Sequence, residues 1–236
     1  MNKTLKSILI SPFKILIDFL FPPFCIITGL KLKEGEYLYS NSVVFKLEIS
    51  GSPIQIRDLK LNNLISKDLY FDNLYSLFAN FSESQEIIHS IKYSKYKKVA
   101  RQFGKNLGVK IKKEMQINYD YIIPVPLHKV RLRERGFNQA FIIAEGVNDV
   151  LNSNLLEFGV NRIKYTTTQT KLTAEERKNN LENVFQINEE FKSLIENKNI
   201  LIIDDVFTTG STINSVAKEL NKYNCKTIDC ATLTLA

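Results

Sequence analysis

Two adjacent carboxylates follow an apolar run and precede a loop rich in small hydroxyl residues. The run Ile200–Ile203 is typical of a buried strand, and Asp204 and Asp205 come directly after it. The loop Thr208–Thr212 then leads into an amphipathic helix. In an open α/β sheet, ligands bind just outside the carboxyl ends of the strands. A loop that opens a helix there points backbone N–H groups outward, so the sequence predicts a phosphate site in this loop.

The composition of the loop suits a phosphate that belongs to a sugar. Gly210 allows close approach of the backbone or a positive φ, and the other loop residues carry hydroxyl groups, namely Thr208, Thr209, Ser211 and Thr212. A phosphate loop does not also need two carboxylates, so Asp204 and Asp205 should bind vicinal sugar hydroxyls or a metal. A phosphate with a diol nearby indicates a ribose 5-phosphate. In the purely structural alternative these residues only cap a turn and a helix, but two carboxylates closing a buried strand are costly for that purpose.

This arrangement resembles the phosphoribosyl-pyrophosphate motif of type I phosphoribosyltransferases: an apolar strand, two acids, then Thr-Thr-Gly-x-Thr. More narrowly, the chain is similar to the ComF family, phosphoribosyltransferase-like proteins associated with DNA uptake in competence. The resemblance is strong in the carboxyl two-thirds and weak between about residues 33 and 80. It is carried by Phe21–Cys25, Ile88–Tyr93, Pro124–Gln139 and a spaced polar set of Thr168, Gln169, Leu172, Arg177 and Asn180.

The resemblance implies a role for each part of the site. Asp204 and Asp205 would be the catalytic acids that bind the ribose hydroxyls, and Thr208–Thr212 would bind the 5-phosphate. The loop after a predicted strand at Tyr121–Val125 would bind pyrophosphate. Its cations are His128, Lys129, Arg131, Arg133 and Arg135. Fixed cations stabilise the negative charge that develops on departing pyrophosphate, although such a basic loop can also be an ordinary solvated turn.

The resemblance also implies a flexible loop, a cofactor and a reaction. The stretch Thr167–Asn180 would close over the site, with Gln169 and Arg177 as the contacts. Mg²⁺ bridging the diphosphate and the ribose suits the oxygen ligands available. The implied reaction is displacement of pyrophosphate from C1 of phosphoribosyl pyrophosphate by an acceptor that the sequence does not specify.

Positive charge is concentrated in one central segment. Between Ile87 and Gly136 there are 13 lysines and arginines against three acids, whereas the whole chain has a net charge of +7. The strip Lys92–Lys113 has nine basic residues and no acid, with Tyr93, Tyr96 and Phe103 interleaved. Stacking aromatics between phosphate-binding cations are typical of a single-stranded DNA surface. Its contacts would be Lys92, Lys95, Lys97, Lys98 and Arg101.

Two interpretations of this strip remain open, and with them two functions. A solvated amphipathic helix with its aromatics turned inward fits the strip as well as a DNA surface does. The first function is a magnesium-dependent phosphoribosyltransferase. The second is a non-catalytic competence factor that binds single-stranded DNA and keeps the phosphoribosyl site as a regulatory or vestigial pocket.

The cysteines bear on compartment and zinc. Three cysteines, at 25, 225 and 230, cannot form a disulfide framework, which favours a reducing, cytoplasmic compartment. Many ComF relatives carry a four-cysteine zinc ribbon near the amino terminus. Here that site reads Cys25-Ile-Ile-Thr28, and the next cysteine is Cys225. Because tetrahedral zinc needs four ligands, no zinc is expected.

The amino-terminal stretch Leu5–Leu30 is mostly apolar, but Pro12, Lys14 and Asp18 interrupt it. A membrane span needs about 20 uninterrupted apolar residues. We therefore expect a helix docked on a protein surface, rather than a secretory signal or an integral membrane span.

The order of elements predicts an α/β fold. Strands alternate with helices in the carboxyl half, which indicates a parallel sheet covered on both faces; with the resemblance, this is the type I phosphoribosyltransferase fold. We expect residues 1–80 to form a small α+β module, a degenerate zinc-ribbon or hood region, and residues 81–236 the phosphoribosyltransferase-like domain. Within them we expect strands at 54–56, 121–125, 162–166, 200–203 and 227–235, helices from about 84 and over 138–151, and a polar loop at 126–135. A homodimer is expected only by analogy with type I transferases.

Overall fold

The computed structural model describes residues 24–25, 29–33, 54–55, 69–78, 81–93, 97–114, 117–163 and 184–235. The chain divides into two compact units, Met1–Lys46 and Leu47–Ala236. In the first unit the described residues form a tight turn, in which the Cys25 N–H donates to the Leu30 carbonyl at 2.7 Å. The predicted amino-terminal helix lies outside the described residues.

One sheet organises the second unit, with its strands in the order β1-β2-β8-β7-β3-β4. Neighbouring strands are parallel except β1 and β2. A second, antiparallel sheet pairs β5 with β6. The strands are β1 (Ile54–Gln55), β2 (Asn73–Phe78), β3 (Tyr121–Pro124), β4 (Asn154–Leu155), β5 (Val160–Arg162), β6 (Phe185–Ile187), β7 (Asn199–Phe207) and β8 (Thr227–Leu235).

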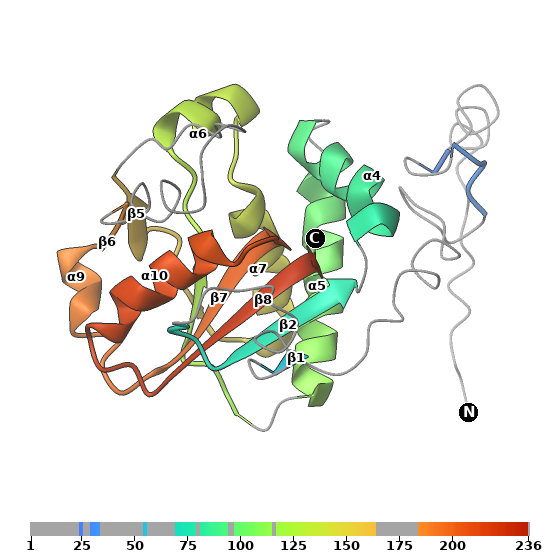
Figure 1. Ribbon diagram of the computed structural model, residues 1–236. Coiled ribbons are helices and arrows are strands. Elements are labelled where there is room, and N and C mark those ends of the chain that lie inside the picture. Colours follow the sequence, from blue (N-terminus) through green and yellow to red (C-terminus); the bar gives the residue numbers. More distant parts are fainter. Residues whose placement is uncertain are drawn as a thin grey trace, which may run out of the picture. The chain divides into compact units, whose positions relative to one another are not determined.

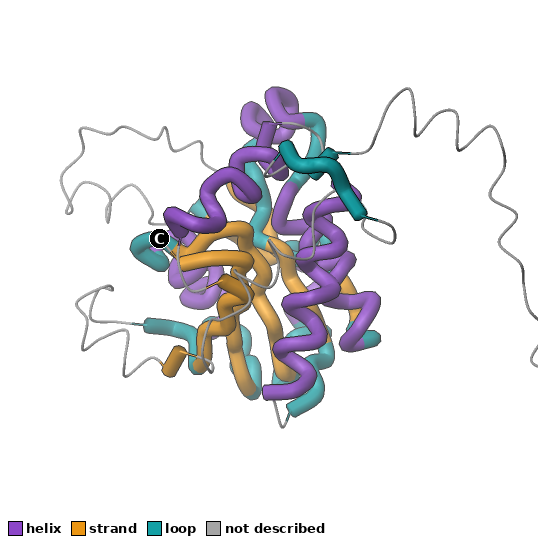
Figure 2. Tube along the Cα trace, turned by 90° about the vertical axis from the view of Figure 1, so that its right-hand side faces the viewer, coloured by secondary structure: helices purple, strands orange, loops and turns teal. Residues whose placement is uncertain are grey.

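Helices cover both faces of the main sheet. In Figure 1, α5 and α7 lie together behind the strands and α10 lies in front of them, and Figure 2 shows the strands as a layer with helices on both sides. The central run Ile200–Ile203 is fully buried, as its composition predicts. The helices are α4 (Phe81–Tyr93), α5 (Lys97–Glu114), α6 (Lys129–Arg135), α7 (Gln139–Leu151), α9 (Glu189–Lys192) and α10 (Ser211–Asn221). The predicted mainly parallel sheet flanked by helices is confirmed.

The second unit begins earlier than the predicted domain boundary at residue 80. Strand β2 lies inside the predicted amino-terminal module, yet it pairs with β8 from Leu74↔Cys230 to Phe78↔Thr234. The side chains of Leu74 and Phe78 are fully buried. This strand therefore belongs to the main sheet, because its apolar side chains complete the core.

Strand β7 is longer than its apolar run. It continues through Asp204 and Asp205 to Phe207 because β8 continues beside it, with Asp204 opposite Thr232 and Phe207 opposite Leu235. On its other edge β3 ends four residues earlier, where Pro124 lies opposite Ile203. The two acids therefore lie where one neighbouring strand has ended and the other has not.

The predicted polar loop after β3 contains a short helix, α6. His128 caps its start, since its Nδ1 accepts the Val130 N–H at 3.3 Å. Gly136 ends it in the left-handed conformation, with φ 77°. The basic residues of this segment are therefore spaced around a helix rather than along an extended loop.

The connections after β3 and β7 lead in opposite directions. From β3 the chain passes through α6 and α7 to β4, on one side, and from β7 it passes through α10 to β8, on the other. The carboxyl ends of β3 and β7 thus form a topological switch point, which is where open α/β sheets bind ligands.

Within the described ranges, no helix has both the length and the apolarity to cross a lipid bilayer.

Candidate active site

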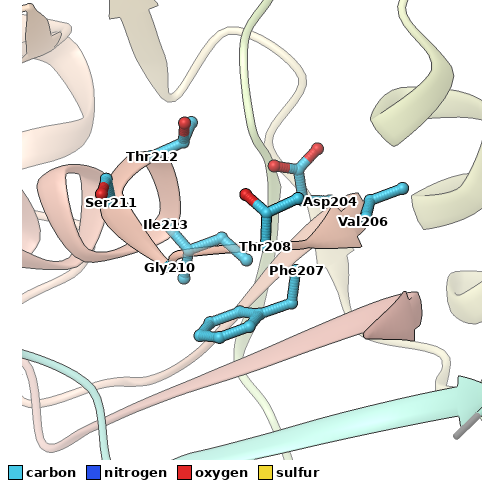
Figure 3. A pocket seen from close by; sticks show the side chains of 8 residues that line it. All are labelled: Asp204, Val206, Phe207, Thr208, Gly210, Ser211, Thr212 and Ile213. Carbon is cyan, nitrogen blue, oxygen red and sulfur yellow. The ribbon is translucent and has the colours of Figure 1, made fainter. Parts of the chain in front are cut away.

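A small pocket opens at the carboxyl end of β7 (Figure 3). Its empty volume is about 210 Å³, which includes space open to solvent. In Figure 3 the Asp204 carboxylate and the hydroxyls of Thr208 and Thr212 lie on one side of the loop, and the Phe207 ring lies on the other. The lining residues are Asp204, Val206, Phe207, Thr208, Gly210, Ser211, Thr212 and Ile213. The pocket therefore combines a carboxylate with hydroxyl groups and a helix start.

Gly210 fixes the turn between β7 and α10. It has φ 69°, and a Cβ at this position would lie 2.6 Å from Cζ of Phe207. Both the left-handed backbone and the aromatic ring beneath it therefore require glycine. As the cap residue of α10, Gly210 has no side chain to bond the first N–H groups of the helix, which favours an anion at this position.

Four of the five residues predicted to bind phosphate line the pocket: Thr208, Gly210, Ser211 and Thr212. The fifth, Thr209, is exposed and does not line it. Its hydroxyl lies 2.8 Å from that of Ser211, so it braces the loop from outside.

The acidic pair is divided between two environments. Asp204 lines the pocket and its Oδ1 accepts the Asp205 N–H at 2.8 Å. Burial and the nearby charge of Asp205 raise the pKa of Asp204 well above the ordinary carboxyl range. Asp205 does not line the pocket. Its Oδ2 lies 3.0 Å from Nζ of Lys92, in the last turn of α4.

The predicted pyrophosphate loop starts directly beside the acids. The Val125 N–H donates to the Ile203 carbonyl at 2.8 Å, so β3 accompanies β7 to the residue before Asp204. The chain then reaches α6 at Lys129. The fold therefore brings the predicted pyrophosphate and phosphate segments to adjacent strand ends.

The cations of α6 differ in exposure and in partners. Lys129 and Arg133 are exposed, whereas His128, Arg131 and Arg135 are half-buried. Arg131 pairs with Glu134 at 3.2 Å, and Nη1 of Arg135 donates to Oε1 of Gln139 at 2.9 Å. None of the five lines the pocket, so their predicted contact with pyrophosphate stays a prediction. Gln169 and Arg177 of the predicted flexible loop lie outside the described residues.

The predicted DNA strip is partly neutralised within the protein. Arg101 donates to Asp149 through Nε at 3.0 Å and Nη2 at 2.9 Å. This contact lowers the pKa of Asp149 to about 2. Lys97 lies over the Phe137 ring at 5.1 Å, and Lys98 is exposed. Phe103 is fully buried against Phe78, so it cannot stack on bases; Lys95 lies outside the described residues.

Three features of the site were not predicted from the sequence. Lys92 pairs with Asp205 although a long segment separates them, and no local pattern signals that contact. The Phe207 ring lies against Gly210, a contact that its place two residues after Asp205 and three before Gly210 suggests. Gln139, almost fully buried, accepts from Arg135. Arg135 ends α6 and Gln139 begins α7, so no helical spacing in the sequence indicates this pair.

Comparison with known proteins agrees with this geometry. The family model described as "Phosphoribosyl transferase domain" matches residues 138–235. Competence protein F of Haemophilus influenzae is 29% identical over 182 residues, covering 75% of this chain and 79% of that protein. The chain belongs to the ComF family. DNA utilization protein YhgH of Shigella flexneri is 30% identical over 155 residues, covering 62% of the chain and 66% of that protein.

Other proteins resemble this ComF-family chain less. Competence protein ComFC of Bacillus subtilis is 26% identical over 146 residues, covering 61% of the chain and 55% of that protein. A glutamine phosphoribosylpyrophosphate amidotransferase from B. subtilis has a TM-score of 0.41 at 16% identity, covering 61% of this chain and 30% of that one. A hypoxanthine phosphoribosyltransferase from Staphylococcus aureus has a TM-score of 0.37 at 20% identity, covering 59% and 64%. The fold is that of type I phosphoribosyltransferases, as the family match and the sheet topology show.

Proposed function

We propose that this chain binds phosphoribosyl pyrophosphate with Mg²⁺ and acts as a phosphoribosyltransferase. The observation that carries the proposal is the pocket at the switch point, where Asp204 and the start of α10 face the same space. A carboxylate can accept from ribose hydroxyls, and a helix start with hydroxyls beside it can bind a phosphate. A ribose 5-phosphate carries both groups.

The chain's own residues would divide the work of the reaction. The Thr208–Thr212 loop would hold the 5-phosphate and so orient the sugar. Asp204 would accept from the ribose hydroxyls, and its negative charge would favour the oxocarbenium-like state at C1 as pyrophosphate leaves. The cations of α6, which begins directly after β3, would stabilise the charge on the departing pyrophosphate.

The oxygen donors of the pocket fit magnesium brought in with the ligand. Magnesium keeps several waters and is held by one or two carboxylates together with substrate phosphates. Asp204 and the hydroxyls of Thr208 and Thr212 are donors of this type, and no group of three or more His, Cys, Asp or Glu side chains among the described residues would form a cage of its own. When bound, Mg²⁺ neutralises charge on the diphosphate.

Calorimetric titration of phosphoribosyl pyrophosphate, with and without Mg²⁺, tests the proposal. We expect magnesium-dependent binding by the wild type and its loss in Asp204→Asn. Asp149→Asn is a matched control, because Asp149 is an acid on α7 that pairs with Arg101 outside the pocket. A folded wild type that does not bind the ligand would contradict the proposal. Pyrophosphate release in the presence of candidate acceptors would then test turnover.

A second function, binding of single-stranded DNA, is favoured by the exposed lysines of α5 and by the names of the relatives. Lys97, Lys98, Lys112 and Lys113 are exposed on this helix, and the relatives are named for competence and DNA utilization. Binding of an oligonucleotide through these lysines would weaken steeply with salt. Affinity that is equal at low and high salt would contradict this function.

A further inference from the structure

Lys92 makes an ion pair that belongs to the candidate site rather than to an exposed basic surface. Its Nζ lies 3.0 Å from Oδ2 of Asp205, and the two side chains are only 24% and 15% exposed. Asp205 is the immediate neighbour of Asp204, which lines the pocket. A positive charge from α4 is therefore fixed beside the acidic pair at the end of β7.

The helix that carries Lys92 is anchored without this ion pair. Near its start, the Ser84 hydroxyl donates to the Thr234 hydroxyl of β8 at 2.7 Å, and both residues are buried. Along the helix, Ile87 and Ile91 are fully buried, and in Figure 1 α4 lies beside the carboxyl end of β8. The helix α4 is therefore held against the sheet by a buried hydrogen bond and by apolar packing, in addition to the pair between Lys92 and Asp205.

The ion pair between Lys92 and Asp205 changes the net charge that an anionic ligand meets at the pocket. A sugar carrying phosphate groups is strongly anionic, and two adjacent carboxylates at the pocket would repel it. With Lys92 in place, the charge of Asp205 is balanced by a cation that is largely shielded from solvent. The ligand then approaches one uncompensated carboxylate, that of Asp204.

We propose that Lys92 is a positioning residue of this site, which holds the Asp205 carboxylate on the α4 side and balances its charge so that an anionic phosphoribosyl ligand meets Asp204 alone. This inference rests on the proposed function. It gives Lys92 a different role from the DNA contact expected from the basic strip. It also explains why the acidic pair has one member inside the pocket and one outside it.

A double-mutant cycle tests the inference with ribose 5-phosphate and phosphoribosyl pyrophosphate as the titrated ligands. Lys92→Met should weaken binding about tenfold or more, as expected for one uncompensated charge near an anion. Lys92→Arg should bind within about threefold of the wild type, because it keeps the charge. In an Asp205→Asn background, Lys92→Met should weaken binding clearly less, since only the direct attraction of Lys92 for the ligand is lost and no charged Asp205 carboxylate is left unbalanced.

The matched control is Lys226→Met. Lys226 is exposed and directly precedes the start of β8. Because β8 runs parallel to β7, this position lies at the opposite end of the sheet from the pocket, so the variant removes the same charge far from the switch point. We expect wild-type affinity. Circular dichroism establishes that each variant folds, and Lys92→Gln provides a second neutral variant if Lys92→Met does not.

The outcomes separate the two proposals. If the wild type binds and Lys92→Met binds equally well, or loses the same affinity in the Asp205→Asn background, the role of Lys92 is overturned and the proposed function stands. If Lys92→Met weakens only the binding of an oligonucleotide, Lys92 is a DNA contact and the inference is again overturned. If the wild type binds neither sugar phosphate, the proposed function is overturned and this inference with it.

Discussion

Two acids on neighbouring strands of the sheet have opposite surroundings. Asp229, near the start of β8, is fully buried. Its Oδ1 accepts the backbone and side-chain N–H groups of Asn73, both at 2.9 Å, and its Oδ2 accepts the Tyr119 hydroxyl at 2.5 Å. The carboxylate of Asp204, near the end of β7, is hydrogen-bonded to its own neighbour, Asp205. Burial raises the pKa of both acids.

The difference shows how the same buried group can serve structure or binding. Three donors from two residues, Asn73 and Tyr119, bond the carboxylate of Asp229, so it closes the amino-terminal end of the sheet. Asp204 has an acid on one side and a pocket on the other. A buried acid with a raised pKa that faces a pocket is a typical functional group, whereas one whose oxygens are satisfied by the protein is a typical structural group.

The largest effect should come from removing the structural acid, Asp229. Asp229→Ala leaves the Tyr119 hydroxyl and the Asn73 donors without their acceptor inside the protein. Because each buried unsatisfied group costs about 1–3 kcal/mol, we expect the free energy of unfolding to fall by about 3–5 kcal/mol. Urea denaturation measures it. A loss below about 1 kcal/mol would show that water or another donor replaces the network.

Substitution of Asp204 by alanine should have little effect on stability and a large effect on ligand affinity. Asp204→Ala removes a carboxylate that burial and Asp205 destabilise, so the free energy of unfolding should stay the same or rise by up to about 1 kcal/mol. Affinity for phosphoribosyl pyrophosphate should fall about 100-fold, since hydrogen bonds to a charged acceptor are lost. Urea denaturation measures the free energy of unfolding, and calorimetry of the same preparation measures the affinity for phosphoribosyl pyrophosphate. Strong destabilisation with unchanged affinity would reverse the assignment of the two acids.

Gly210→Ala should disturb the binding region without touching either acid. An added methyl would meet the Phe207 ring and the left-handed φ of 69° would be strained, so affinity for ribose 5-phosphate should fall about tenfold, an effect of roughly 1–2 kcal/mol. Gly136→Ala is the matched control, because its φ is 77° and nothing lies within 4 Å of an added Cβ. It should lose about 1 kcal/mol of stability and retain affinity for ribose 5-phosphate. Equal affinity of the two variants would mean that the loop does not bind phosphate.

The smallest effect concerns pH. Because the pKa of Asp204 is raised, part of the population carries a proton on this carboxyl near neutral pH and cannot accept from both ribose hydroxyls. Affinity should therefore rise with pH across the neutral range, by less than tenfold per pH unit, the limit for one proton. The titration of the ligand phosphates, measured on the free ligand, provides the baseline. An affinity that follows the ionisation of the ligand phosphates alone would exclude Asp204 as the titrating group.

Local sequence predicted the strand and the loop that form the pocket. The strand Ile200–Ile203 and the loop Thr208–Thr212 are each a short continuous run of sequence. Their residue types indicate a strand and a loop without reference to distant parts of the chain. The helix α6 was missed, although His128 at its start and Gly136 at its end are capping signals. In this segment the many basic residues favoured the prediction of a polar loop, so the short helix was not predicted.

Long-range contacts could not be predicted in the same way. The extension of β7 through two aspartates, which disfavour strands, depends on the parallel neighbour β8. The place of β2 in the main sheet depends on burial of Leu74 and Phe78 against residues far along the chain. Likewise, the division of the acidic pair between the pocket and Lys92 arises only when α4 packs at the end of the sheet.

A crystal structure with phosphoribosyl pyrophosphate and Mg²⁺ at saturating concentration tests most directly whether the pocket at Asp204 is the binding site. We predict the 5-phosphate within hydrogen-bond distance of the N–H groups at the start of α10 and the ribose hydroxyls at the Asp204 carboxylate. A ligand bound elsewhere, or a pocket that stays empty while the ligand is saturating, would contradict the assignment of this end of the sheet as the site.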